Sequence, residues 1–153
     1  MENFIQQHFI GVWHHFLYFE INRSNFAVQT FGSANAYLIF QVIAWHHILV
    51  MMDQAEAKVR KEAVELWFKL TETGFKTRTV LTYSLISSMT SLSIETIRRQ
   101  VKKLEKNNWV TYSKKEGVKF SPSEENNKFL ADVFNVREVR DLGRFLDVIE
   151  KQK

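Results

Sequence analysis

Cysteine is absent from this chain of 153 residues, while proline occurs once and glycine five times. Without cysteine there is no disulfide bond, thiolate zinc site or cysteine nucleophile. So little proline and glycine favours long helices over a sheet of short strands and turns. Long hydrophobic runs are also scarce. The most apolar one, residues 37–52, contains Gln41, His46 and His47 and is shorter than the roughly 20 residues of a membrane span. We expect it to be a buried helix, with no membrane association.

The first residues, Met1-Glu2-Asn3-Phe4, include no basic residue and lead to no small-residue cleavage site, so we expect no secretory signal. Together with the absence of cysteine, this favours a cytoplasmic protein. The chain also has no recognisable nucleophile elbow, phosphate-binding loop, pair of carboxylates in an apolar setting, or spacing of metal ligands. We therefore expect neither an enzyme nor a bound cofactor or metal.

Positive charge is unevenly distributed, although the formal net charge is only +4. Residues 76–122 contain ten Lys or Arg and three acidic residues, which gives them a net charge of +7. The rest of the chain contains eleven Lys or Arg and fourteen acidic residues, which gives a net charge of −3. This pattern is typical of a protein in which one region meets phosphate groups and the other does not.

The apolar periodicity predicts a mostly helical chain. Helices are expected over residues 3–21, 34–73, 80–89, 93–106, 123–134 and 136–150. The first should end in a turn at residues 22–25, and Ser33 should cap the second. The second is either one helix or two, with a break near Met52 and Asp53. A capping box at residues 121–124 should open the helix that follows.

Residues 93–106 form the most informative segment. Ile97, Val101 and Leu104 make an apolar stripe, Ser93 is a suitable N-cap, and basic residues occupy the rest of the surface. A short helix and a turn precede this segment. The β-prone residues 109–113 and 118–120 follow, with Lys114 to Gly117 as the hairpin loop. The order helix, turn, basic helix and hairpin predicts a winged helix-turn-helix.

A helix of this kind reads DNA from the major groove. Side chains near its N-terminus reach base edges, where an arginine can pair with guanine, and cations further along meet phosphates. Lysines at the hairpin would reach the backbone or the minor groove. The expected DNA-binding residues are Ser91, Ser93, Glu95, Thr96, Arg98, Arg99, Lys102, Lys103, Lys106, Lys114, Lys115 and Lys119. The alternatives are an ordinary solvated helix and a winged helix that binds protein without DNA.

The segment from Leu92 to Val110 reads Leu-Ser-x-x-Thr-Ile-x-x-x-Val-Lys-x-Leu-Glu-x-x-x-Trp-Val. It resembles the recognition-helix segment of bacterial winged-helix transcriptional regulators of the MarR and GntR types. The flanking helices resemble the MarR arrangement, in which terminal helices build a homodimer. MarR wings usually carry a longer loop with an Asp-x-Arg element, whereas here only Lys114 to Gly117 separates the strands, which leaves lysines as the wing contacts.

This resemblance implies a homodimeric transcriptional regulator that binds palindromic double-stranded DNA. The expected fold is mostly α with a small β-hairpin wing, the winged helix-turn-helix being flanked by N- and C-terminal dimerisation helices. Three regions follow: residues 1–75 for dimerisation and sensing, 76–122 for DNA binding, and 123–153 for C-terminal helices on the dimer interface.

Residues 1–75 contain fourteen of the twenty-one aromatic residues and all five histidines. An aromatic stripe of this kind usually forms a core or a dimer interface. The alternative is a pocket for a small-molecule effector, lined by Trp13, Phe16, Tyr37, Trp45 and Trp67.

The histidines occur as His14-His15 and His46-His47, with His8 alone. Adjacent helical residues diverge, so each pair offers at most one ligand to a given point. We expect hydrogen bonds at helix seams rather than a metal site. The last helix carries a row of three arginines interleaved with acids, for which we expect pairing within the helix or between subunits rather than DNA contact; the row is Arg137, Arg140 and Arg144.

Overall fold

The computed structural model describes residues 1–54, 56, 59–74 and 79–152. This part of the chain is mostly α-helical with one antiparallel hairpin, in agreement with the composition. The elements are α1 (Glu2–Gln7), α2 (Phe9–Phe31), α3 (Ala34–Gln54), α4 (Arg60–Thr73), α5 (Tyr83–Thr90), α6 (Ile94–Lys106), β1 (Val110–Ser113), β2 (Gly117–Phe120), α7 (Glu124–Phe129), the π-helical segment η1 (Leu130–Phe134) and α8 (Asn135–Lys151).

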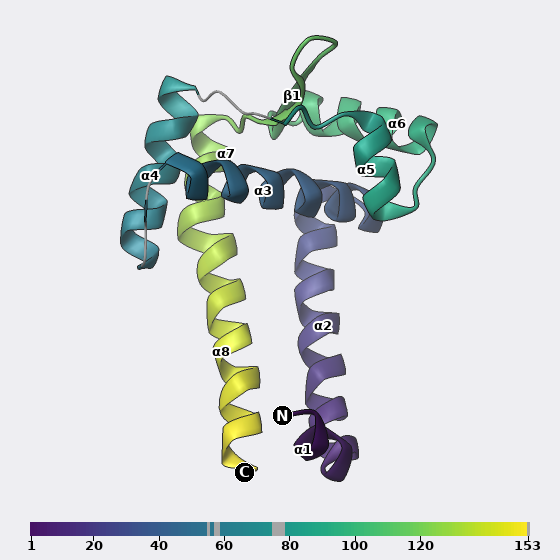
Figure 1. The fold of residues 1–153 in the computed structure, drawn as a ribbon, viewed down its shortest axis with the longest axis vertical. Coiled ribbons are helices and arrows are strands. Elements are labelled where there is room, and N and C mark those ends of the chain that lie inside the picture. The colour runs from purple at the N-terminus through teal and green to yellow at the C-terminus, as the bar shows by residue number, and fades with distance from the viewer. Residues whose placement is uncertain (55, 57–58, 75–78, 153) are drawn as a thin grey trace.

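Helix α3 is the centre of the fold (Figure 1). The long helices α2 and α8 extend from one side of it, while α5, α6 and the hairpin lie on the other side. One hydrophobic core joins these layers and includes residues of all three regions expected from the sequence. It contains Ala27, Phe31, Ala36, Tyr37, Ile39, Phe40, Val42, Ile43, Leu81, Ile86, Ile97, Val101, Leu104, Trp109, Val110, Val118, Phe120, Leu130 and Phe134.

By length and composition alone, α3 could cross a membrane. The core helix of a soluble protein passes the same test, and half of the qualifying window is buried inside the fold. Ile39 and Ile43 are almost completely buried, and Phe40 stacks on Phe31 with ring centroids 4.2 Å apart. The apolar run of residues 37–52 is thus helical, as predicted, but only about half buried, and Trp45, Ile48 and Met52 are exposed.

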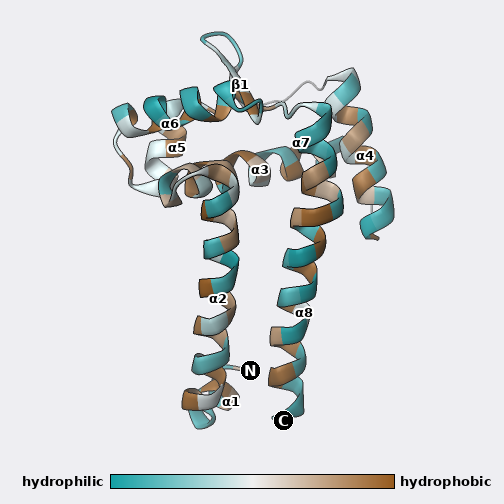
Figure 2. Ribbon diagram, turned by 180° about the vertical axis from the view of Figure 1, so that it is seen from behind, coloured by the Kyte–Doolittle hydropathy of each residue, from teal (hydrophilic) through white to brown (hydrophobic). Residues whose placement is uncertain are grey.

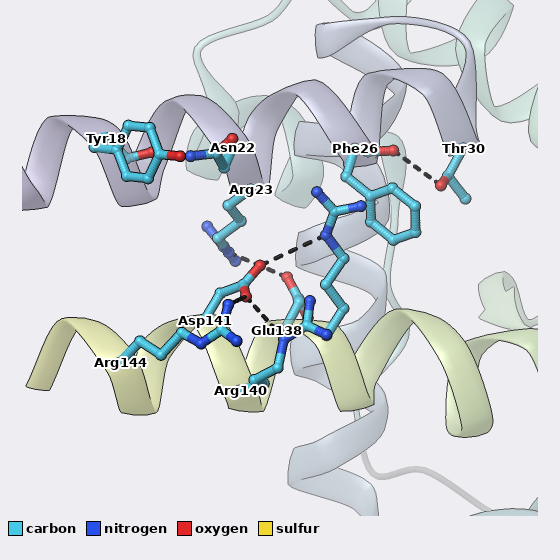
Figure 3. Close-up of polar contacts among 10 residues, drawn as sticks. Tyr18, Asn22, Arg23, Phe26, Thr30, Glu138, Arg140, Asp141 and Arg144 are labelled. Carbon is cyan, nitrogen blue, oxygen red and sulfur yellow. Dashed lines mark hydrogen bonds and ion pairs between the residues drawn. The ribbon is translucent and has the colours of Figure 1, made fainter. Parts of the chain in front are cut away.

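Helices α2 and α8 lie side by side and are joined by mixed contacts (Figure 3). The Arg23 Nε donates to Glu138 Oε1 at 3.1 Å. The rings of Phe19 and Phe145 stack with centroids 5.6 Å apart, and the Arg137 guanidinium lies 4.1 Å from the centroid of the Phe26 ring. These contacts fix the two helices against each other without burying much of either one.

The arginine row of α8 pairs within the helix. All three guanidinium groups approach one carboxylate, that of Asp141. The distances are 3.5 Å from Arg137, 3.2 Å from Arg140 and 3.9 Å from Arg144. The intrahelical pairing predicted from the interleaved charges is therefore present.

The turn expected at residues 22–25 is wrong, because α2 continues to Phe31. Asn22 Nδ2 donates to the carbonyl of Tyr18 one turn earlier, and Arg23 is held by Glu138. The helix ends instead at Gly32, whose φ of 87° is easily adopted only by glycine. Ser33 Oγ then accepts from Ala36 N at 3.1 Å, so the predicted cap is confirmed.

Among the described residues of 34–73, α3 ends at Gln54 and α4 begins at Arg60. Near the C-terminus, Ser123 Oγ accepts from Asn126 N at 3.3 Å, so Ser123 is the N-cap of α7. The predicted capping box, in which Ser121 is the cap and Pro122 the first helical residue, is wrong, because α7 begins two residues later, at Glu124. The expected break between Phe134 and Val136 is wrong, since η1 joins α7 directly to α8. The expected boundary at 75/76 lies outside the described residues.

Candidate nucleic-acid interface

Helix α6 is anchored by its inner face. Ile97, Val101 and Leu104 are buried, as the stripe predicted, and Gln100 is buried beside them. The Gln100 Oε1 accepts from Ser33 Oγ at 3.4 Å, which ties α6 to the start of α3. At its N-terminus, Ser93 Oγ accepts from Thr96 N at 3.2 Å, the predicted N-cap. The helix is therefore held along one side and presents the other to solvent.

The connection between α5 and α6 is a short hydrogen-bonded turn. Ser91 adopts a left-handed conformation with φ of 58°, and its N–H donates to the Ser87 carbonyl at 2.9 Å. Ser87 Oγ donates to the carbonyl of Leu92 at 2.7 Å. This turn sets the orientation of α6 relative to α5.

A row of charged residues lies directly opposite the buried face of α6. Glu95, Arg99, Lys102 and Lys106 follow one another at spacings of four, three and four residues, which places them on one side of the helix. All four are exposed. Within the described part of the chain, none of these three cations forms a salt bridge. Their charges are available to an external anion.

Arg98 and Lys103 flank this row. Arg98 Nη1 donates to Glu95 Oε2 at 2.9 Å, and both side chains are at least half exposed. An exposed pair of this kind contributes little to stability, but it holds the guanidinium at the edge of the face. The structure thus distinguishes Arg99, which points outward, from Arg98, which is paired.

The hairpin pairs Val110 with Phe120 and Ser113 with Gly117. Its lysines are not equivalent. Lys114 and Lys115 are exposed at the tip, whereas Lys119 Nζ donates to Glu116 Oε1 at 2.6 Å. This hydrogen bond lowers the pKa of the Glu116 carboxyl.

Glycine is required where the hairpin meets the chain before α5. Gly117 has φ of 69° and pairs with Leu81 in an isolated parallel bridge. A Cβ at this position would lie 2.5 Å from the Leu81 carbonyl oxygen, to which Val118 N donates at 2.9 Å. Leu81 therefore acts as a minimal third strand that fixes the hairpin beside α5.

Further contacts that the sequence did not reveal join the hairpin to α6 and α5, and α7 to the residues that follow α6. Glu105 Oε1 accepts from Tyr112 N at 2.7 Å, and Tyr112 stacks on Tyr83 of α5 with centroids 4.5 Å apart. Burial is the main cause that raises the Tyr83 pKa to about 12. Asn126 Nδ2 donates to the carbonyls of Asn107 and Asn108 at 2.8 and 3.0 Å. No short-range pattern indicates these pairs, because their members belong to different elements.

The structure brings the expected DNA-binding residues of α6 and the hairpin to one side of α3, away from α2 and α8 (Figure 1). The hydroxyl of Ser93 is used for capping and also donates to Thr96 Oγ1. Ser91 shapes the turn. Lys76 and Arg78, which contribute to the basic block, lie outside the described residues.

The five aromatic residues expected to line an effector pocket are not brought together within one chain. Trp13 and Phe16 contact each other on α2 with centroids 5.0 Å apart, and Tyr37 is buried against Phe31. Trp45 is 48% exposed on α3. Of the five, Trp67 lines a cavity in the described part of the chain, and the expected pocket between the dimer helices and the winged helix stays a prediction.

That cavity has a volume of about 400 Å³ and lies between α3, α4, β2, η1 and α8. Its wall includes His47, Trp67 and Phe120. His47 is buried, with its ring centroid 4.7 Å from that of Phe120. Burial, with a smaller contribution from neighbouring His46, lowers the pKa of His47 to about 4. The imidazole is therefore uncharged at neutral pH.

The histidines take different positions. His46 Nε2 lies 3.0 Å from the Thr79 carbonyl, His14 and His15 contact each other edge to face, and His8 lies against Phe4. In the described residues, no three His, Asp or Glu side chains form a group that could hold a metal ion.

No protein-family model, curated protein or solved structure matches this chain significantly.

Proposed function

We propose that this protein is a homodimeric, sequence-specific DNA-binding transcriptional regulator with a winged helix-turn-helix. Helix α6 would enter the major groove, and the hairpin would act as a short lysine wing. The observation that carries this proposal is the row of exposed cations directly opposite the buried face of α6. A helix with its side chains is about 10–12 Å in diameter, so α6 fits the width of a major groove, which is about 12 Å.

The positions along α6 suggest two kinds of contact. Glu95 and Arg99 lie in its first half, where side chains reach base edges; a carboxylate can accept from cytosine N4 and an arginine can pair with guanine. Lys102 and Lys106 lie in its second half and suit phosphates. Lys114 and Lys115 would contact the backbone or the minor groove beside the helix. Because Lys119 is paired with Glu116, it is the weakest candidate among the wing lysines.

Exposed apolar side chains on α2 and α8 support the homodimer. Val139, Leu142 and Leu146 form a stripe along α8 in which each residue is 44–52% exposed. On α2, Ile10 and Leu17 are likewise exposed, and apolar residues recur along both helices (Figure 2). Monomeric proteins rarely leave so many large apolar groups in water. A second copy that covers them would set two α6 helices about one DNA turn apart.

Binding to a random-sequence DNA pool tests the proposal. The purified full chain should select related, palindromic fragments after several rounds. Fluorescence anisotropy would measure its affinity for these fragments at several salt concentrations. The logarithm of the affinity should fall linearly with the logarithm of the salt concentration, because the protein's Lys and Arg side chains release counterions from the phosphates. A protein-binding winged helix is the rival. Failure to retain any duplex at low salt would exclude DNA binding and favour that rival.

A further inference from the structure

A groove between α2 and α8 has the size of a small-molecule site. Its volume of about 350 Å³ falls within the range of about 300–1,000 Å³ typical of ligand pockets. Helix α8 contributes Asp141 and the arginine row to its wall, and α2 contributes Tyr18 and Asn22 (Figure 3). Phe19 and Phe145, whose rings stack between the two helices, line it as well. The groove thus combines a charged wall with an aromatic one.

Positive charge exceeds negative charge at this groove. The three guanidinium groups of the arginine row lie 3.2–3.9 Å from the carboxylate of Asp141. Among the described residues that line the groove, Asp141 is the one acidic residue. Glu138, one turn closer to the N-terminus of α8, is paired with Arg23 of α2 at 3.1 Å. One carboxylate balances one guanidinium, so two positive charges remain in excess.

This excess charge is unfavourable in the absence of an anion. All three guanidinium groups lie within 4 Å of one carboxylate, so they are within about one Debye length of one another, which is about 8 Å at physiological salt. Like charges at this separation repel one another. Exposed ion pairs contribute little to stability, so the pairing with Asp141 does not by itself explain why three arginines are placed here. A bound anion would balance them.

The arginines are placed to donate hydrogen bonds to such an anion. A guanidinium has five N–H donors in a planar fork, which matches the oxygens of a carboxylate or a phosphate. Arg137 and Arg140 approach Asp141 through Nε, and Arg144 does so through Nη1. Arg137 is also held against the ring of Phe26, at 4.1 Å from its centroid. The side chains of Arg140 and Arg144 are 53% and 72% exposed, so a ligand can reach them.

The groove would remain open in the proposed dimer. Residues two positions apart on an α-helix point in directions about 200° apart. Leu142 of the apolar stripe is two positions from both Arg140 and Arg144, so these arginines lie on the opposite side of α8. On α2, His15 lines the groove, whereas Leu17, two positions later, is exposed on the other side. A second copy that covers the stripe would leave the groove accessible.

We propose that this groove binds a small molecule with a doubly charged anionic group, either a phosphate monoester or a dicarboxylate. The anionic group would lie among the three arginines, and a small apolar body would contact Phe19 and Phe145. The site is separate from the charged face of α6, which lies on the other side of α3 (Figure 1).

Isothermal titration calorimetry at pH 8 and constant ionic strength tests the proposal with four probes. Phenyl phosphate and phenylmalonate carry two charges at this pH, benzoate carries one, and benzyl alcohol carries none. The full chain should bind one dianion per subunit, at least about 10-fold more tightly than benzoate, and should not bind benzyl alcohol. The dianion that binds more tightly identifies the preferred group as a phosphate or a pair of carboxylates.

Two substitutions in α8 should change the affinity in opposite directions. Arg144→Gln removes one guanidinium and should weaken binding of the dianion by about 10-fold. Asp141→Asn removes the carboxylate that competes with the ligand and should tighten binding by about 3- to 10-fold. If the cluster only stabilised the helix, the loss of Asp141 would not give tighter binding.

Two matched controls locate the binding. Lys69→Gln removes an exposed cation from α4, and Arg99→Gln removes one from the charged face of α6. Neither should change the affinity, and circular dichroism would check that each variant is folded. No saturable binding of either dianion, equally tight binding of benzoate, weaker binding by Asp141→Asn, or a loss in either control equal to that of Arg144→Gln would overturn the proposal. Because no DNA is present, its failure is distinguishable from failure of the proposed DNA binding.

Discussion

The two sides of α3 differ in how completely they bury their apolar residues. Helix α6, with 13 residues, buries three apolar residues together with Gln100 and exposes a charged face. Helix α8, with 17 residues, buries only Ile149 and leaves an apolar stripe in water. Within one chain, the buried face of α6 is already covered by other elements, and the opposite face is charged. The apolar stripe of α8 would be removed from water only if another surface packed against it.

This difference separates two tasks. A rigid layer of α5, α6 and hairpin can present cations in a fixed pattern, while the α2 and α8 pair can join two such layers. The cavity lies at the junction, since its wall takes residues from β2 on one side and α8 on the other. Substitutions in the layer of α5, α6 and hairpin, in the α2 and α8 pair, and at the cavity should therefore have different consequences.

The largest effect is expected on the α2 and α8 side. Leu142→Glu places a carboxylate in the exposed stripe, and in a symmetric dimer it does so twice. Burying one unpaired charge costs about 4 kcal/mol, equivalent to roughly a thousandfold weaker dimer for each of the two carboxylates. Sedimentation equilibrium should show a dimer for the wild type and a monomer for the variant. Lys151→Glu, at the end of the same helix, is the control. A monomeric wild type would contradict the assignment of this surface.

The junction should be sensitive to pH through His47. Its pKa is about 4 in the folded state and about 6.5 when unfolded. Between these values only the unfolded state takes up the proton, so stability falls as pH decreases from about 6.5 to 4. The full loss is about 3 kcal/mol. His46, Arg60 and Glu138 lie nearby, so other groups contribute to the total slope.

The variant His47→Phe isolates this contribution. Urea unfolding at fixed protein concentration, at pH 7 and pH 4, should show a loss about 3 kcal/mol smaller in the variant than in the wild type. Identical losses in the two proteins would mean that His47 is protonated in the folded state.

A glycine-to-alanine change at two sites compares the regions directly. Gly117→Ala forces a side chain into a positive φ and within 2.5 Å of the Leu81 carbonyl. It should destabilise the chain by about 2 kcal/mol. Gly143→Ala lies on α8 in open space and should stabilise that helix by about 0.5–1 kcal/mol. Thermal unfolding of both variants checks the opposite signs. Equal shifts would show that the hairpin is not fixed at Leu81.

Features that depend on neighbouring residues could be predicted from the sequence. Ser33 and Ser93 each cap a helix, because the acceptor and the donor are three residues apart. The apolar stripe of α6 and the hairpin loop before Gly117 follow from periodicity and turn chemistry in the same way. These local rules were sufficient to place the charged face.

Features that depend on distant residues could not be predicted. The run 22–25 looks like a turn, yet Arg23 is held by Glu138, which is 115 positions away. The cavity joins α3, α4, β2 and α8, so its residues share no local pattern. Because α4 covers one side of it through Trp67 and Arg60, only the packing of that helix reveals the cavity.

The smallest effects are expected on the charged face of α6, where two substitutions should differ in kind. Arg99→Ala removes a side chain placed to reach bases. This substitution should reduce the binding free energy by about 1–3 kcal/mol on the selected sequence and by much less on unrelated duplex DNA. Lys102→Ala should weaken binding to all sequences alike. It should also reduce the slope of log affinity against log salt concentration by about 1. Anisotropy titrations on both duplexes at several salt concentrations measure these quantities.

Lys69→Ala is the matched control, because Lys69 is an exposed cation on α4, outside this face. It should leave the affinity and the salt slope unchanged. If Lys69→Ala lowers the slope as much as Lys102→Ala does, DNA binds through general charge rather than through α6. If Arg99→Ala weakens both duplexes equally, the first half of α6 contacts phosphates and does not read bases. Either result would leave α6 well folded, since its buried face is untouched, and would change only what its exposed face recognises.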